Sequence, residues 1–278
     1  MLLRSINRFG KESSRRWTST VGILGMGRVG SSFAASAVEC GKLKVNVVDT
    51  APRVDDGIKR VEDLLTSRGT NGKNLRKISF VEDAKALAKN SDFIIDALEP
   101  ELGKAASLRV LAHYAKTEAP IAVACMGDLS VTKLASNSEI ASRIVGVHCF
   151  REPHESSVAE VVKGLDSSDE AVKQVIALMG ELGKRCVVCK DSPGFISERL
   201  LITYINEAAQ ALGEGISSPE DVDLIMSKGT ADVMGPLAFA DELGLDRCLQ
   251  TMKMLYEKFC DSRYRPAPIL VRYVEGNR

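Results

Sequence analysis

The sequence lacks an excess of either charge, a long apolar run and a disulfide framework. Its 37 basic and 37 acidic side chains balance, which argues against nucleic acid as a partner, because such proteins usually present a basic face. No apolar run approaches the roughly 20 residues of a membrane-spanning helix, so we expect a soluble chain with no membrane span. The seven cysteines are scattered and odd in number, which favours reduced thiols.

Cys186 and Cys189 form the one C-x-x-C pattern, inside the strand-like stretch "RCVVCKD". Residues three apart on a strand point to opposite faces. The pair is therefore poorly placed as a redox dithiol or a metal ligand set, and we predict no metal site.

Acidic residues are almost absent from residues 1–20, "MLLRSINRFGKESSRRWTST", where Glu12 is the only one. Arginine and serine are frequent there, and Leu2, Ile6 and Phe9 fall on one helical face. This composition is typical of a mitochondrial transit peptide and predicts a matrix protein. A basic tail is the alternative, and under either interpretation we exclude the segment from the fold.

The remaining chain divides into two patterns. Apolar strand-like runs alternate with amphipathic helical ones over residues 21–190, as in "TVGILG", "KVNVVD", "SDFIIDAL" and "RIVGVHCF". This alternation predicts an α/β Rossmann-type fold, a doubly wound parallel sheet covered by helices on both faces. Residues 191–278 read as helix throughout, which predicts an all-α C-terminal domain. With 278 residues, 45% of them hydrophobic, the chain can bury a substantial core.

A glycine motif stands where the first predicted strand becomes a helix. In "VGILGMGRVG", Gly25, Gly27 and Gly30 form G-x-G-x-x-G, and Asp49 closes the next strand twenty-four residues after Gly25. Gly25 permits the tight turn, Gly27 lets a pyrophosphate approach the backbone, and Gly30 allows close packing of helix and strand. Asp49 would accept hydrogen bonds from the adenosine ribose, which favours NAD over NADP. A purely structural turn is the alternative.

Several longer blocks carry a more specific pattern, among them "IVGVHCFREPHESSVAEVVKG", "KDSPGFISERLLITYINEAAQAL" and "MGPLAFADELGLD". They resemble the L-3-hydroxyacyl-CoA dehydrogenase family over about residues 21–278. The resemblance implies an NAD-binding domain joined to a helical domain that dimerises. It also implies reversible oxidation of a 3-hydroxyacyl-CoA to a 3-ketoacyl-CoA, as in fatty-acid β-oxidation, at a site between the domains.

The resemblance assigns catalysis to His148, at a strand end, and Glu160, twelve residues later in "VAEVVKG". The pair also makes chemical sense. Removing a hydroxyl proton as hydride leaves the same carbon requires a base that titrates near neutral pH, and histidine does so. A carboxylate on the other ring nitrogen fixes the tautomer and stabilises the imidazolium. A lone histidine at a strand end could otherwise be a hydrogen-bonded core residue.

Three positions of the expected substrate pocket depart from the family pattern. Gly127 stands where a serine usually contacts the substrate oxygen, Arg151 replaces an asparagine, and Glu198 replaces the asparagine of "P-G-F-x-x-N-R". Losing one donor to the developing oxyanion typically costs about 10²–10³ in rate. Glu198 could be protonated, paired with Arg151 or turned away, and Arg151 could supply the missing positive charge.

Three functional hypotheses therefore stand. The first is an NAD-dependent 3-hydroxyacyl-CoA dehydrogenase, and the second is a weakened or inactive dehydrogenase-fold subunit of a mitochondrial assembly. The third is an oxidoreductase that acts on a hydroxy acid without CoA. Partners would be the acyl-CoA and either a second copy of the chain or the assembly.

Overall fold

The computed structural model of the protein describes residues 19–278, apart from 70–71, 100, 137, 230–233 and 277–278. The predicted transit segment, residues 1–20, therefore lies almost entirely outside the described residues. The first strand begins at its end, with Thr20.

Eight strands form one sheet in the order β3-β2-β1-β4-β5-β6-β7-β8. They are β1 (Thr20–Leu24), β2 (Lys44–Val48), β3 (Ile78–Phe80), β4 (Phe93–Asp96), β5 (Ile121–Ala124), β6 (Ile144–His148), β7 (Val158–Lys163) and β8 (Arg185–Lys190). The strand order reverses between β1 and β4, and ligands of doubly wound sheets bind at the carboxyl ends of the strands at such a switch point. The predicted Rossmann-type fold is confirmed.

One strand departs from the prediction. Residues 158–163 form β7, which the sequence pattern did not reveal, and β7 runs antiparallel to β6. The connection between them, residues 149–157, is too short for the crossover of a dozen or more residues that a parallel pair needs. The remaining strand pairs in the sheet are parallel.

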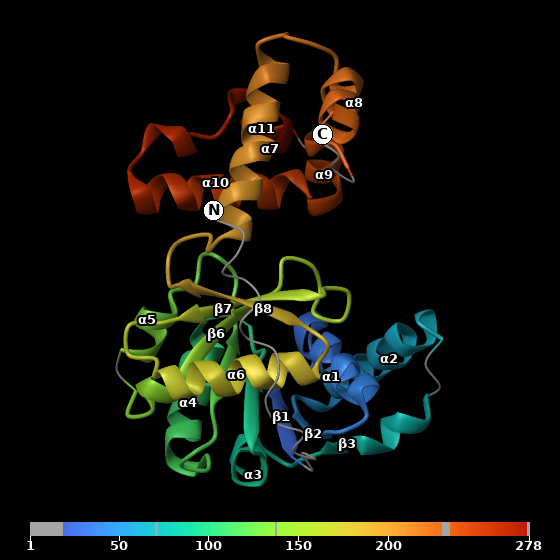
Figure 1. Ribbon diagram of the computed structural model, residues 1–278, viewed down its shortest axis with the longest axis vertical. Coiled ribbons are helices and arrows are strands. Elements are labelled where there is room, and N and C mark those ends of the chain that lie inside the picture. Colours follow the sequence, from blue (N-terminus) through green and yellow to red (C-terminus); the bar gives the residue numbers. More distant parts are fainter. Residues whose placement is uncertain (1–18, 70–71, 100, 137, 230–233, 277–278) are drawn as a thin grey trace, which may run out of the picture.

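Helices cover both faces of the sheet (Figure 1). They are α1 (Arg28–Cys40), α2 (Ala51–Ser67), α3 (Ala84–Asn90), α4 (Glu101–Tyr114), α5 (Val131–Ala135) and α6 (Asp169–Glu181), with short 3-10 turns at Gly72–Lys77 and Ala141–Arg143. One buried core joins the sheet to α1, α2 and α6, and a second joins it to α3, α4 and α5. Alternation along β4 separates them, since Phe93 and Ile95 enter the first core and Ile94 the second.

After β8, the residues that the structure describes form helices and no strands, as predicted. They are α7 (Ser197–Gly213), α8 (Pro219–Gly229), α9 (Pro236–Leu243), α10 (Leu245–Phe259) and α11 (Pro268–Glu275), with a 3-10 turn at Ser262–Tyr264. The buried faces of α7, α9, α10 and α11 make a third core, which contains Ile205, Met252 and Leu255. Figure 1 shows this helical part beyond one end of the sheet, joined to it by the segment that leads into α7.

Cys186 and Cys189 lie on β8 and contact different cores. Cys186 packs against the core on the α6 side of the sheet and Cys189 against the core on the opposite side. Their thiols therefore point to opposite faces, as the strand assignment predicted.

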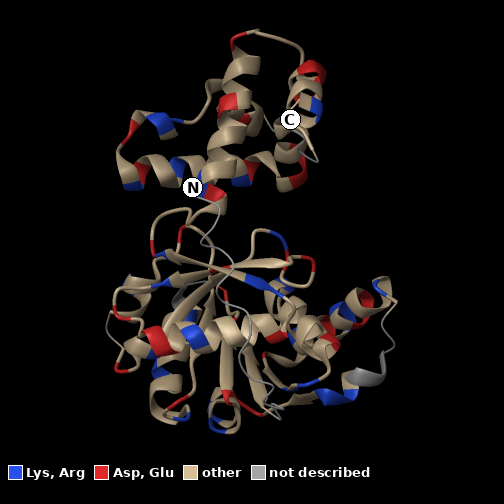
Figure 2. Ribbon diagram, viewed as in Figure 1, with Lys and Arg blue, Asp and Glu red and all other residues tan. Residues whose placement is uncertain are grey.

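Charged side chains of both signs are interspersed over the sheet domain and the helical part (Figure 2). Within the described residues, none of the helices combines the length and the apolar character that crossing a bilayer requires.

Candidate active site

The glycine motif forms the turn between β1 and α1. Gly25 has a φ of 90°, a left-handed conformation that side chains disfavour. A Cβ on Gly30 would lie 1.8 Å from the Gly25 carbonyl oxygen, whereas a Cβ on Gly27 would meet nothing within 4 Å. Gly30 is thus required for helix and strand to pack, and the backbone at Gly27 faces open space at the start of α1. This cradle fits the pyrophosphate of a dinucleotide.

Asp49 lies directly beside this turn, after the end of β2. Its carboxylate accepts hydrogen bonds from the backbone N–H of Met26, at 2.7 Å, and of Thr50, also at 2.7 Å. The bond to Met26 fixes the carboxylate against the glycine motif. An acidic residue at this position, beside the glycine turn and after the second strand, fits the dinucleotide fingerprint.

His148 and Glu160 are brought together by strand pairing. They are opposite residues of the antiparallel pair β6–β7, so their side chains lie on the same face of the sheet. The Nδ1 atom of His148 lies 2.8 Å from Oε2 of Glu160, and both residues are buried. The unpredicted antiparallel strand is thus what creates the predicted pair.

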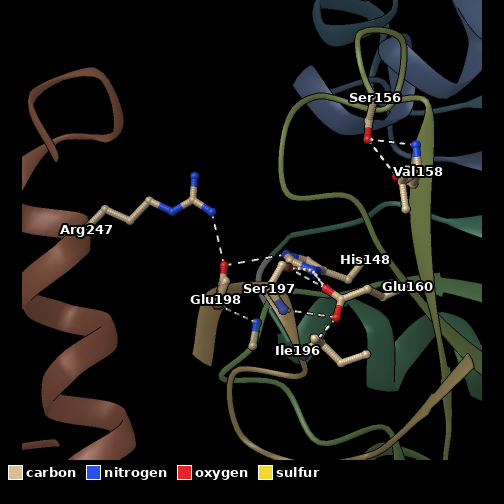
Figure 3. A network of polar contacts seen from close by, with 9 residues as sticks. His148, Ser156, Val158, Glu160, Ile196, Ser197, Glu198 and Arg247 are labelled. Carbon is tan, nitrogen blue, oxygen red and sulfur yellow. Dashed lines mark hydrogen bonds and ion pairs between the residues drawn. The ribbon is translucent and has the colours of Figure 1, made fainter. Parts of the chain in front are cut away.

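Glu160 is held in turn by the start of α7 (Figure 3). Its Oε1 accepts the backbone N–H groups of Ile196, at 2.7 Å, and Ser197, at 3.1 Å, and its Oε2 also accepts the Ser197 hydroxyl. Phe195 just before them has a φ of 48°, and its ring lies 5.4 Å from that of His148. Sequence reasoning missed Ser197, although its place between Phe195 and Glu198 in the "PGFISE" block was a signal.

Glu198 points at the other nitrogen of His148. Its Oε1 lies 3.5 Å from Nε2 and 3.0 Å from Nη2 of Arg247, and its Oε2 accepts the backbone N–H of Gly127 at 3.1 Å. Of the alternatives left open for Glu198, the structure shows an ion pair, but with Arg247. Arg151 pairs instead with Glu242, at 2.6 Å. Arg247, on α10, was missed because no local pattern links it to α7.

Both carboxylates act on the pKa of His148. Burial alone would lower this pKa, but the hydrogen bond to Glu160 and the close contact with Glu198, together with the negative charges of both carboxylates, raise it from 6.5 to about 8. Burial would conversely raise the pKa of each carboxyl. For Glu160 the bonds from His148, Ser197 and Ile196 outweigh burial and lower the pKa. For Glu198 the interactions with His148 and Arg247 do the same.

A cleft of about 400 Å³ joins the glycine turn to the histidine. Arg28 and Val29 line it at the start of α1, His148 lines it at the end of β6, and Arg247 lines it from the helical part. Arg151 lines the cleft too, and Gly127 lies between the lining residues Met126 and Asp128. One continuous space therefore connects the dinucleotide cradle with a buried acid–base group.

Comparison with known proteins agrees with this geometry. Residues 20–192 match the model for the 3-hydroxyacyl-CoA dehydrogenase NAD binding domain, and residues 194–278 match that for the C-terminal domain of the same family. A probable 3-hydroxybutyryl-CoA dehydrogenase of Bacillus subtilis is 31% identical over 91% of each chain. The mitochondrial hydroxyacyl-coenzyme A dehydrogenase of Sus scrofa is 28% identical, over 93% of this chain and 87% of its own.

A solved structure gives the same result in three dimensions. The (S)-3-hydroxybutyryl-CoA dehydrogenase of Ralstonia eutropha superposes with a TM-score of 0.86 and 34% identity, covering 94% of this chain and 95% of its own. The chain belongs to the NAD-dependent 3-hydroxyacyl-CoA dehydrogenase family.

Proposed function

We propose that the protein interconverts L-3-hydroxyacyl-CoA and 3-ketoacyl-CoA in fatty-acid β-oxidation, with His148 as the general acid–base and Glu160 as its orienting carboxylate. The 2.8 Å contact between His148 Nδ1 and Glu160 is the observation that carries this proposal. It holds a proton on Nδ1, which leaves Nε2 on the cleft side free to exchange a proton with substrate.

The geometry supports the following steps. In the oxidative direction, neutral His148 takes the 3-hydroxyl proton on Nε2 as hydride leaves the same carbon, and NAD, when bound, accepts that hydride. Glu160 stabilises the imidazolium that forms, because its own three donors keep the carboxylate charged and in place. In the reductive direction His148 returns the proton to the 3-keto oxygen.

NAD would be held by the glycine turn. Backbone groups at Gly25 and Gly27 and the start of α1 would contact the pyrophosphate, while Gly30 keeps the helix close enough to do so. Asp49 would accept the ribose hydroxyls and repel the 2′-phosphate of NADP. Gly127, Arg151 and Glu198 would border the thioester end of the substrate.

The direct test is turnover of acetoacetyl-CoA, the four-carbon 3-ketoacyl-CoA. We expect the protein to consume NADH with this substrate, and NADPH far more slowly, because of Asp49. Free acetoacetate serves as the control that separates acyl-CoA chemistry from chemistry on an uncoupled keto acid. Absence of NADH consumption with acetoacetyl-CoA, in protein with an intact melting transition, would reject the proposed reaction.

The helical part supports a homodimer as the working form. We propose residues 21–190 as the NAD-binding domain and 191–278 as the dimerisation and substrate domain. An apolar groove between α7 and α8 carries exposed Ile216, Leu224 and Ile225, which are 70%, 57% and 65% exposed. Such a contiguous apolar surface is suited to covering by a second copy.

The Ile225→Asp variant tests this interface. We expect the wild-type chain to have twice its 30.1 kDa mass in light scattering, and the variant to run as a monomer, because it places a charge in the apolar contact. The exposed Glu220→Gln exchange on the same helix is the control. A wild-type monomer, or a dimer unaffected by Ile225→Asp, would contradict the proposed interface.

We also propose residence in the mitochondrial matrix. The support is the arginine-rich, acid-poor composition of residues 1–20 and the similarity to a mitochondrial enzyme of Sus scrofa. Residues 1–20 fused to a fluorescent protein should direct it to mitochondria. Diffuse fluorescence would contradict this location.

A second candidate function is a catalytically weakened subunit of a mitochondrial assembly. The observation that favours it is Glu198, whose carboxylate stands beside Nε2 of His148 where family members usually carry a neutral donor. NAD binding without acetoacetyl-CoA turnover, in protein that co-purifies with a larger complex, would support this function. An active free dimer would exclude it.

A further inference from the structure

Both nitrogens of His148 face a carboxylate. Nδ1 lies 2.8 Å from Glu160 and Nε2 lies 3.5 Å from Glu198, and all three side chains are buried. Figure 3 shows the imidazole between the two acids. A neutral imidazole has one N–H and one lone pair, so in that form one nitrogen would present its lone pair to a carboxylate. Only the imidazolium suits both neighbours.

Glu198 is held in this position by contacts that do not involve the histidine. Arg247 binds one carboxylate oxygen and the backbone N–H of Gly127 binds the other. A Cβ on residue 127 would lie 2.3 Å from Oε2 of Glu198. A side chain at 127 is therefore excluded by two neighbours, the carboxylate of Glu198 and the backbone of Gly194, whose Cα would lie 2.6 Å from the added Cβ.

Other ionisable groups around the His148 ring do not supply the negative charge that Glu160 and Glu198 place beside it. Arg247, which lines the cleft, offsets part of the negative charge of Glu198. Lys104 and Asp128 line the same cleft. Cys189 lies near Glu160, but burial and the nearby acids raise the pKa of its thiol to about 12, so it stays neutral. The two glutamates are thus the negative charges that the ring meets directly.

We propose that Glu198 is a positioning residue that stores a proton on Nε2 of His148, so that the site without substrate is already set for ketone reduction. This inference rests on the proposed function of His148. The 3.5 Å separation between Nε2 and the Glu198 carboxylate exceeds a hydrogen bond. An incoming 3-keto oxygen can therefore accept a hydrogen bond from Nε2, while Glu198 keeps its own contacts with Arg247 and Gly127. NADH is then oxidised as C3 gains hydride, the oxygen gains the Nε2 proton, and the hydroxyl product leaves neutral His148 to be reprotonated from solvent.

Reduction and oxidation by His148 depend on pH in opposite directions. Because the pKa of His148 is raised to about 8, the protonated form needed for reduction persists through neutral pH and is lost above about pH 8. The neutral form needed for oxidation is correspondingly scarce below that pH. Removing the negative charge of Glu198 should lower the pKa of His148. The loss of reduction and the gain of oxidation with rising pH should then both occur at lower pH.

The Glu198→Gln variant tests the inference, because it keeps size and removes charge. We expect kcat/KM for acetoacetyl-CoA reduction, which reports the free enzyme, to fall at a pH about one unit lower than in the wild type. Near pH 9 this is about a tenfold lower kcat/KM, after normalising each protein to its acidic plateau. Glu214→Gln, which removes a charge at the far end of α7, is the matched control and should leave the profile unchanged.

A second readout does not depend on activity. NMR titration of the three histidines in protein free of NAD follows the His148 resonance, which is assigned by its loss in His148→Gln. Its midpoint should also move down by about one unit in Glu198→Gln. If that variant does not fold, Glu198→Asn serves in its place. An unchanged midpoint overturns the inference, whereas absent turnover in wild-type and variant protein rejects only the proposed reaction.

Discussion

Replacing His148 with glutamine is expected to lower kcat for acetoacetyl-CoA reduction by about 10³-fold, within the range that loss of a general acid–base produces. Glutamine has a similar volume and can still donate to Glu160, but it has no proton to transfer to the 3-keto oxygen. NADH should bind as before, because the glycine turn and Asp49 belong to other elements. Steady-state kinetics and NADH titration by fluorescence measure the two effects separately.

The control for this variant is His113→Gln. His113 lies exposed on α4, so its exchange should leave both kcat and NADH affinity at the wild-type values. If His148→Gln kept activity comparable to that of the His113 variant, His148 could not be the acid–base group.

The Glu160→Gln variant should lose about 10³-fold in kcat for a different reason, which is the tautomer of His148. The N–H groups of Ile196 and Ser197 would each require an acceptor, so the amide oxygen of the new side chain would face them. The amide nitrogen would then donate to Nδ1 of His148. This places the ring proton on Nε2 in the neutral form and removes the base needed for oxidation.

Kinetics in both directions check this expectation. The rate of 3-hydroxybutyryl-CoA oxidation should be lower than in the wild type at every pH at which the wild type is active. The imidazolium of His148 should also lose the stabilisation that the negative charge of Glu160 provides. Glu181→Gln removes a carboxylate that pairs with Lys42 at the surface, at 2.9 Å, and should have no effect. Full oxidative activity in Glu160→Gln would show that Glu160 does not orient the base.

The parts of the fold that depend on local sequence could be predicted. The strand, glycine turn, helix and Asp49 follow one another within thirty residues, so their pattern determines their arrangement. The strand β7 was not predicted, because Glu160 interrupts its apolar run and the residue's burial depends on partners elsewhere. Its antiparallel direction depends on the length of a connection that contains no helix.

The candidate site was predictable only where a family pattern fixed the spacing. His148 and Glu160 could be paired from their spacing, whereas the partner of Glu198 could not. Arg247 is forty-nine residues away on another helix, and only the packing of α10 against α7 brings them together. Arg151, nearer in the expected pocket, was the alternative that sequence allowed, but it pairs with Glu242 on α9 instead.

The contact between His148 and Glu198 also affects how the sheet and the helical part are held together. His148 ends a strand of the sheet and Glu198 stands at the start of α7, so their attraction ties the two halves of the molecule together. That tie depends on the charge of the imidazole, and it weakens whenever the ring becomes neutral. Loss of the Nε2 proton to the product would therefore weaken this one contact between the sheet and α7, while the bonds from Ile196 and Ser197 to Glu160 would remain.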